Sequence, residues 1–429
     1  MKVAFYTLGC KVNSYETEAV MEKFLAKGYE VVDFDGVSDV YVINSCMVTN
    51  TGEKKSKQIT RRPYHHNPEA IVIVMGCLSQ LKAVEMMEID GVKIVIGTKN
   101  RENLVDYLEN YLEDQIPRNL VSALEKDEEY DALTINDFHT QKRAFLKIQD
   151  GCNNFCTYCI IPYTRGRIRS KAKDLILEEI DQLVKHGHIE VVLTGIHTGG
   201  YGADLKDYSF ADLLRDLEKV RGLERIRISS IEISELDEEI LEVITQSKKI
   251  VHHLHIPLQS GSNRILKLMN RKYHKEEFLD KLNKIREKIA DVAFTTDVIV
   301  GFPSETEADF EEAYDFIKKA AFQELHVFPY SRRSGTVADK MPEQVDPQTK
   351  KNRVHKLLEL SDFLMAEYIE KSIGKTVKVI AEQEKEGFLI GHSRDYIALK
   401  FKGDKLLLGR EVEVKVIAPE KPYNLGSLV

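Results

Sequence analysis

The first third of the chain alternates short apolar runs with segments of helical periodicity. Four runs have the character of strands, and they lie at residues 2–7, 40–44, 71–75 and 93–96. A helix is expected after the first run, with Asn13 as its N-cap and Glu16 completing a capping box. Because the strands are continuously apolar and separated by helices, they predict a parallel sheet covered on both faces.

A second alternation occupies the middle of the chain. Strands are expected at residues 144–149, 190–194, 225–229, 253–257, 294–300 and 324–328. Helices are expected at residues 174–186, 210–220, 237–245, 263–269, 275–289 and 305–320. Six such repeats predict a barrel or partial barrel, in which functional groups lie at the carboxyl ends of the strands.

Two other segments differ in character. Residues 116–140 are acidic and lack apolar periodicity, so we interpret them as a linker. Residues 369–429 contain short strands separated by glycines, which indicates a small antiparallel barrel. The predicted fold class is α/β, with a parallel-sheet domain over 1–115, a partial (β/α)6 barrel over 141–368 and the small β-barrel at the end.

The composition is that of a globular protein, because 43% of the residues are hydrophobic and 30% are charged. We recognise neither a signal peptide nor an apolar run of about eighteen residues, which a membrane span needs. We therefore expect a cytoplasmic protein without membrane contact. In that compartment thiols stay reduced, and grouped cysteines hold metal more often than they form disulfides.

Three of the six cysteines stand together, at Cys152, Cys156 and Cys159, directly after the first predicted barrel strand. A four-cysteine cluster and a tetrahedral zinc site both need four ligands, so either another ligand joins them or one metal position stays open. A zinc site would predict a second closely spaced ligand pair. The adjacent pairs 65–66 and 252–253 are histidines that would chelate poorly, because neighbours on a strand point to opposite faces. We interpret them as ordinary histidines.

The other three cysteines, Cys10, Cys46 and Cys77, each follow the carboxyl end of a predicted strand. In an open parallel sheet these ends share one edge, where ligands bind. Each cysteine by itself could be a small buried residue, since free cysteine is among the most buried residue types. Three at equivalent positions favour a shared site.

These motifs resemble a known family. The Cys-x₃-Cys-x₂-Cys loop is similar to that of the radical S-adenosylmethionine (SAM) enzymes, and the whole chain resembles the methylthiotransferases among them. The segments that carry this resemblance are residues 7–13, 44–46, 76–77, 159–167, 258–261 and 301–303. The last domain resembles the TRAM module, an RNA-binding barrel.

The resemblance implies two [4Fe–4S] clusters and SAM, used both as methyl donor and as radical source. Cys152, Cys156 and Cys159 would hold the cluster that cleaves SAM, and the three amino-terminal cysteines would hold a second cluster that carries the sulfur. The radical would abstract hydrogen from C2 of an adenine, which then receives the methylthio group. The candidate SAM contacts are Tyr158, Gly195, Ile196, Ser230, Gln259, Val300 and Phe328. Strand capping or barrel packing is the alternative role for each of them.

The family has three branches, which act on isopentenyladenosine in tRNA, on an aspartate of a ribosomal protein, or on threonylcarbamoyladenosine in tRNA. The Leu-Gly-Cys-Lys-Val-Asn sequence at 8–13 and the segment 326–336 resemble the third branch. This implies modification of C2 of N6-threonylcarbamoyladenosine at position 37, in the tRNA anticodon loop, with a reductant such as flavodoxin or ferredoxin. The alternatives are another branch, a radical SAM enzyme of a different reaction, and a non-catalytic Fe–S protein that binds RNA.

Basic residues cluster although the chain carries a net charge of −8. A single basic run is usually a solvated helix face, but several runs beside the proposed sites are better explained by phosphate contacts. The residues expected to bind RNA are Arg61, Arg62, Arg165, Arg167, Arg169, Arg332 and Arg333.

Overall fold

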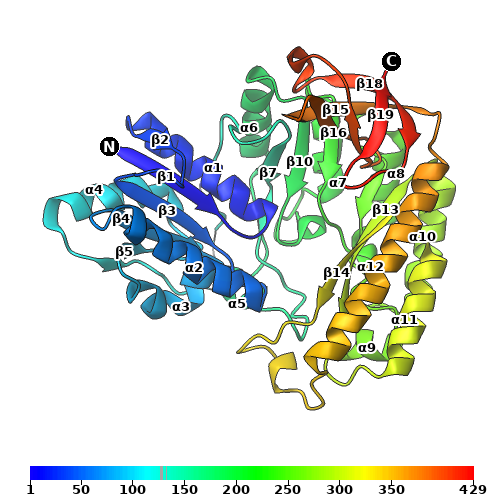
Figure 1. Ribbon diagram of the computed structural model, residues 1–429, viewed down its shortest axis with the longest axis horizontal. Coiled ribbons are helices and arrows are strands. Elements are labelled where there is room, and N and C mark those ends of the chain that lie inside the picture. The colour runs from blue at the N-terminus through cyan, green and yellow to red at the C-terminus, as the bar shows by residue number, and fades with distance from the viewer. Residues whose placement is uncertain (126–128, 132) are drawn as a thin grey trace.

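The computed structural model describes residues 1–125, 129–131 and 133–429, and it consists of three packed units (Figure 1). The amino-terminal unit is a six-stranded sheet in the order β2-β1-β3-β4-β5-β6, and every neighbouring pair is parallel. Its strands are β1 (Lys2–Thr7), β2 (Glu30–Val32), β3 (Val40–Ser45), β4 (Ile71–Gly76), β5 (Val92–Val95) and β6 (Arg118–Asn119). Its helices are α1 (Lys11–Ala26), α2 (Asn50–His66), α3 (Cys77–Met87) and α4 (Leu104–Asp114), with a 3₁₀ turn at Arg101–Asn103. All side chains of β3 and β4 are buried, as the continuous apolar runs predicted.

The middle unit contains the six predicted barrel strands, arranged as two three-stranded parallel sheets. The strands are β7 (Ala144–Lys147), β10 (Glu190–Thr194), β11 (Arg225–Ile228), β12 (His253–His255), β13 (Ala293–Val300) and β14 (Glu324–Pro329). A parallel bridge between Ile226 and Ile250 joins the two sheets. The result is a curved, incomplete barrel, which confirms the predicted fold class.

Helices cover the outside of this barrel (Figure 1). They are α6 (Lys173–Lys185), α7 (Phe210–Glu218), α8 (Glu238–Gln246), α9 (Asn263–Leu268), α10 (Lys275–Lys288), α11 (Glu307–Ala320) and α12 (Pro347–Glu370). Before α6, a short helix α5 (Ile161–Arg165) lies between the paired strands β8 (Gln149–Asp150) and β9 (Arg169–Ser170). The helix α12 packs on β14, where the Leu325 amide donates to Oγ of Ser361 at 3.0 Å.

The carboxy-terminal unit is a closed barrel in the order β15-β16-β17-β19-β18. Its strands are β15 (Thr376–Lys385), β16 (Phe388–Ser393), β17 (Ala398–Phe401), β18 (Glu411–Ala418) and β19 (Asn424–Leu428). The sequence did not predict β19, whose Asn-Leu-Gly-Ser-Leu stretch has no β-branched residue. This strand pairs in parallel with β17, whereas the other pairs of the barrel are antiparallel.

The segment predicted as a linker, residues 116–140, makes hydrogen bonds to α1 through several of its described residues. Residues 126–128 and 132 lie outside the described residues. The Tyr15 hydroxyl donates to the Leu133 carbonyl at 2.9 Å, and the amides of Asn136 and Asp137 donate to the Glu22 carboxylate at 2.7–3.0 Å. Apolar side chains within the segment are buried against the main core, among them Phe138. The segment therefore fixes the first unit against the barrel.

A buried charge cluster completes this connection. The Glu16 carboxylate of α1 pairs with Arg101 at 2.5 Å, with Lys147 of β7 at 2.9 Å and with Arg165 of α5. Asp150 is a second anion of the cluster and pairs with Lys147 at 2.6 Å. Burial alone would raise the pKa of Glu16, but Arg101, Arg165 and Lys147 outweigh burial and hold this pKa well below its usual range. Glu16 is therefore ionised at neutral pH, and removing any one partner would leave buried charge unpaired.

The carboxy-terminal barrel is bound to the amino ends of the middle strands. Arg225 donates to Glu411 at 2.6 Å and to the Lys378 carbonyl at 2.7 Å, and Arg227 donates to the Ser393 carbonyl at 3.1 Å. Within the described part of the chain, no helix combines the length and the apolar character needed to cross a bilayer.

Candidate active site

The three amino-terminal cysteines lie at one edge of the first sheet, as their positions predicted. Cys10 is the N-cap of α1 and comes three residues after the end of β1, Cys46 directly follows β3, and Cys77 directly follows β4 and begins α3. The loops are in contact, because a Cβ added to Gly9 would lie 3.1 Å from Sγ of Cys46. Gly9 also has φ +106°, a conformation that glycine adopts without strain.

Asn13 holds these loops together instead of capping the helix. The helix begins at Lys11, so the predicted N-cap at Asn13 is wrong. The Asn13 side chain donates to the Leu8 carbonyl at 2.7 Å and to the Ser45 carbonyl at 3.3 Å. Its amide therefore bridges the residues that precede Cys10 and Cys46, while the predicted capping-box partner Glu16 belongs to the charge cluster.

The second cysteine set lies in the loop between β8 and α5, and N–H groups point at sulfur atoms in both sets. The Asn154 amide donates to Sγ of Cys152 at 3.4 Å, and Arg271 donates to Sγ of Cys156 at 3.5 Å. Arg165 donates to Sγ of Cys77 at 3.3 Å. Such donors stabilise thiolate ligands and tune the clusters that they hold.

The spacing of the sulfur atoms distinguishes a cluster from a single ion. Two thiolates on one zinc ion, each about 2.3 Å from it, lie at most about 4.6 Å apart. Among the described residues, the group with three ligand atoms within 4.8 Å of one another is His255, Asp297 and His326, and neither cysteine set meets this limit. Neither cysteine set is therefore arranged around a single ion in this structure, and three thiols in a set suit a [4Fe–4S] cluster with one open position.

Burial also affects the thiols that would bind metal. Burial raises the pKa of Cys46 to about 11 and that of Cys159 to about 12. Both thiols are therefore protonated at neutral pH without metal, and cluster assembly must release their protons.

A cavity of about 260 Å³ lies inside the barrel and reaches the first cysteine set. Cys10 and Lys11 of the first unit line its edge, and side chains of β10 to β14 line its walls. Tyr396 of the carboxy-terminal unit also lines it, with its ring stacked on His253 at 4.7 Å between centroids. All three units therefore contribute to one chamber.

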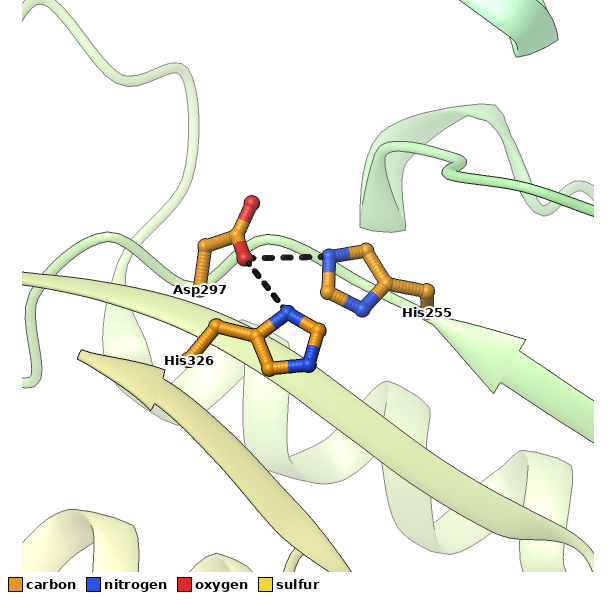
Figure 2. A group of neighbouring side chains, drawn as sticks. All are labelled: His255, Asp297 and His326. Carbon is orange, nitrogen blue, oxygen red and sulfur yellow. Dashed lines mark ion pairs between the residues drawn. The ribbon is translucent and has the colours of Figure 1, made fainter. Parts of the chain in front are cut away.

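Two histidines meet one carboxylate in this cavity. Figure 2 shows the side chains of His255, Asp297 and His326, which come from three adjacent strands. Nε2 of His255 and Nδ1 of His326 each lie 3.3 Å from Oδ1 of Asp297. Burial would raise the pKa of Asp297, but the two histidines outweigh burial and lower it. The hydrogen bond to Asp297 raises the pKa of His326.

The predicted SAM contacts do not all reach the cavity. Gly195 and Ser230 line it. An added Cβ at Gly195 would lie 2.8 Å from Oε1 of Gln149, so a larger residue there would displace a side chain that braces the cysteine loop. The remaining candidates lie elsewhere: Tyr158 packs near Phe302, Val300 is buried, Phe328 is exposed, Ile196 is half-buried, and Gln259 has a left-handed backbone with φ +66°.

The predicted RNA contacts fall into two groups. The side chains of Arg61, Arg167 and Arg332 are exposed, although Arg332 pairs with Asp339 at 2.6 Å. Arg62 is half-buried and paired with Asp35. The other three, Arg165, Arg169 and Arg333, are buried. Arg165 belongs to the charge cluster, Arg169 donates to the carbonyls of Arg165 and Arg167, and Arg333 bonds Asn50 and Glu53 of α2. In this structure these three guanidinium groups therefore make contacts within the protein, and RNA contact by them stays a prediction that the structure does not favour.

Several residues of the site were not predicted. His255, Asp297 and Lys11 line the cavity, and the histidine at 253, interpreted as ordinary, lines it too. The sequence contained a signal for this pair, because the histidines at 253 and 255 are two residues apart on a predicted strand and therefore point to the same face. Arg271, which donates to Sγ of Cys156, was not predicted as a site residue either.

Two family models match the chain. Residues 146–317 match the Radical SAM superfamily, and residues 2–97 match an uncharacterized protein family, UPF0004. The two ranges correspond to the barrel and to the sheet that carries the first cysteines.

Curated relatives match over nearly the full length. A threonylcarbamoyladenosine tRNA methylthiotransferase, MtaB, of Bacillus subtilis is 50% identical over 100% of this chain and 96% of its own. The MtaB of Aquifex aeolicus is 41% identical over 94% of this chain and 98% of its own. A tRNA-2-methylthio-N(6)-dimethylallyladenosine synthase of Acetivibrio thermocellus is 35% identical over 99% and 90%.

Among solved structures, the chain is similar to the radical S-adenosylmethionine methyltransferase TsrM from Kitasatospora setae. The TM-score is 0.58 at 12% identity, and the match covers 91% of this chain and 77% of that one. At this identity the likeness concerns the fold alone.

Proposed function

Since the chain belongs to the radical SAM methylthiotransferases, we propose that it transfers a methylthio group to C2 of N6-threonylcarbamoyladenosine at position 37 of tRNA. The observation that carries the proposal is the shared chamber, in which Cys10 meets barrel strand ends that carry Gly195 and Ser230. The two MtaB relatives, at 50% and 41% identity, support threonylcarbamoyladenosine over isopentenyladenosine.

The cofactors are SAM and two [4Fe–4S] clusters. We assign Cys152, Cys156 and Cys159 to one cluster and the three amino-terminal cysteines to the other. When bound, the clusters supply the electron that cleaves SAM to a radical and the sulfur that is transferred.

The residues of the chain position and shield this chemistry. Asn13 bridges two cysteine loops, and Arg165 connects Cys77 to the charge cluster that joins the units. Tyr396 covers one wall of the cavity, which limits the access of water to a reactive radical.

We assign RNA contact to the exposed arginines Arg61, Arg167 and Arg332, together with the small carboxy-terminal barrel. Arg167 also lies over the Phe155 ring at 5.0 Å, next to the cysteine loop. A cation beside an aromatic ring suits a single-stranded loop, which combines phosphates with stacking bases. A reductant such as flavodoxin or ferredoxin and a cytoplasmic location complete the proposal.

The test is anaerobic reconstitution with an iron count, followed by nucleoside analysis of an anticodon stem-loop that contains threonylcarbamoyladenosine. We expect about eight irons and a methylthio product that requires SAM. A reconstituted enzyme that modifies the isopentenyladenosine stem-loop and leaves the threonylcarbamoyladenosine stem-loop unchanged would contradict the proposal.

A further inference from the structure

The cavity contains a cationic side chain without a partner. Lys11 is exposed at the cavity edge, one residue after Cys10, and within the described residues its ammonium has no hydrogen bond or ion pair. The two arginines of the cavity differ in this respect. Arg143 pairs with Glu382 at 2.9 Å, and Arg227 pairs with Glu190 at 3.0 Å.

A chain of hydrogen bonds in the same cavity ends on an unpaired nitrogen. Nδ1 of His255 and Nε2 of His253 both contact Oγ1 of Thr295, at 2.9 and 3.0 Å. His253 is 4% exposed, and its Nδ1 has no partner among the described residues. Burial, followed by the charge of Arg227, lowers the pKa of His253 well below its usual range, so the ring is neutral. Its Nδ1 is a donor or an acceptor, depending on the tautomer.

His326 offers a further unpaired nitrogen. Its Nδ1 faces Asp297, and within the described part of the chain its Nε2 makes no hydrogen bond. Asp297 already has two histidine partners, each 3.3 Å from its Oδ1, whereas Lys11 has no partner among the described residues. This balance disfavours a bound cation, although the three ligand atoms of His255, Asp297 and His326 are close enough for one. The cavity instead favours an anion with additional polar groups.

We propose that Lys11, with His326 and His253, forms a subsite that binds the threonyl carboxylate of the substrate and so selects threonylcarbamoyladenosine. The inference rests on the proposed function and deepens it. The threonylcarbamoyl group supplies a carboxylate for the ammonium and hydroxyl and amide groups for the ring nitrogens. An isopentenyl group has none of these and would leave the polar atoms unpaired, which is the strongest basis for rejecting a ligand.

The test uses the holoenzyme and two anticodon stem-loops, one with threonylcarbamoyladenosine and one with the methyl ester of its carboxylate. We expect the wild type to bind the acid on the order of 10- to 100-fold more tightly than the ester, the range for a hydrogen bond to a charged group. Lys11→Met keeps the aliphatic stem and removes the charge, so the acid should bind as weakly as the ester. Lys11→Arg keeps the positive charge and should therefore retain the preference for the acid over the ester.

Two controls separate other causes. Lys23→Met changes a lysine on the same helix, about 18 Å along its axis, and should leave both affinities unchanged. An unchanged iron count in Lys11→Met shows that the neighbouring Cys10 still holds its cluster. SAM affinity is measured in parallel because SAM also carries a carboxylate, and it should not change.

Three results would overturn the inference. The first is a wild type that forms the methylthio product but binds the acid and the ester equally. The second is a Lys11→Met enzyme that still prefers the acid. The third is a Lys11→Met enzyme that keeps this preference but loses SAM affinity. In each case product still forms on the wild type, so the proposed function survives. Absence of product on the threonylcarbamoyladenosine stem-loop would contradict the proposed function itself.

Discussion

Arg165 and Arg167 are two residues apart, and we predict opposite consequences of replacing them by glutamine. The Arg165 side chain is fully buried, pairs with Glu16 and Asp150, and donates to Cys77. Arg165→Gln removes one of the cations that compensate two buried carboxylates and leaves an excess of buried negative charge, which costs up to about 3–5 kcal/mol. At roughly 2–4 °C per kcal/mol for a domain of this size, thermal unfolding should shift down by about 6–20 °C.

Arg167 is exposed and lies over the Phe155 ring. Arg167→Gln should leave thermal unfolding within about 2 °C of the wild type, as surface changes usually do. It should reduce the slope of log affinity against log salt by about 0.7, the value for one phosphate contact on a single strand. The assays are calorimetry and fluorescence anisotropy with an anticodon stem-loop over a salt series. A reduced salt slope at unchanged stability in Arg165→Gln would contradict the structural role of Arg165. Unfolding of Arg167→Gln with an intact slope would contradict the RNA contact of Arg167.

Three further predictions concern the clusters and the interface between units. Cys46→Ala should reduce the iron count from about eight to about four and abolish the methylthio product while 5′-deoxyadenosine still forms; an unchanged product would contradict the two-cluster assignment. Gly76→Ala should also reduce the iron count, because its Cβ would lie 2.4 Å from Oδ1 of Asn44 and displace the start of α3, and normal cluster loading would refute this. Burial raises the pKa of Glu190, but Arg227, Arg143 and Arg225 outweigh burial and lower it from 4.5 to about 2. Because the pKa of Glu190 is lower in the folded than in the unfolded state, the residue contributes about 3 kcal/mol to the free energy of unfolding. This contribution should be present above pH 4.5 and be lost as pH falls toward 2. Glu190→Gln should remove that part of the acid sensitivity in unfolding experiments, and an unchanged acid profile would count against the mechanism.

Strands that are apolar and bounded by helix- or strand-breaking residues were predicted from the sequence with little error. Residues 2–7 and 190–194 are strands with the predicted bounds, and the six barrel strands appear in the predicted order. This success follows from burial on both faces, which leaves a continuous apolar signal in the sequence. The strand β19 carries no such signal, because its pairing is decided by the closure of the barrel rather than by its own residues.

Charged and polar residues were harder to place, because burial depends on partners distant in sequence. Arg165 belongs to a basic run, and a run of that kind predicts an exposed face. Its partner Glu16 is 149 residues away, and only the packing of α1 against the barrel brings the two together. Asn13 was misassigned for the same reason, since its acceptor at Ser45 is 32 residues distant. Local capping patterns cannot distinguish an N-cap from an amide that bridges two loops.

The Tyr396 ring touches elements of two units. It stacks on His253 and His392, both at 4.7 Å, and the guanidinium of Arg227 lies 4.9 Å from its centre. A truncation before residue 369 would remove Tyr396 as well as the predicted RNA-binding barrel. The wall of the cavity that Tyr396 covers would then be open to solvent. Thiols and reductants that entered there would donate a hydrogen atom to the radical, and SAM would be consumed without product. We therefore expect the carboxy-terminal unit, through Tyr396, to affect how much of the SAM cleavage leads to product.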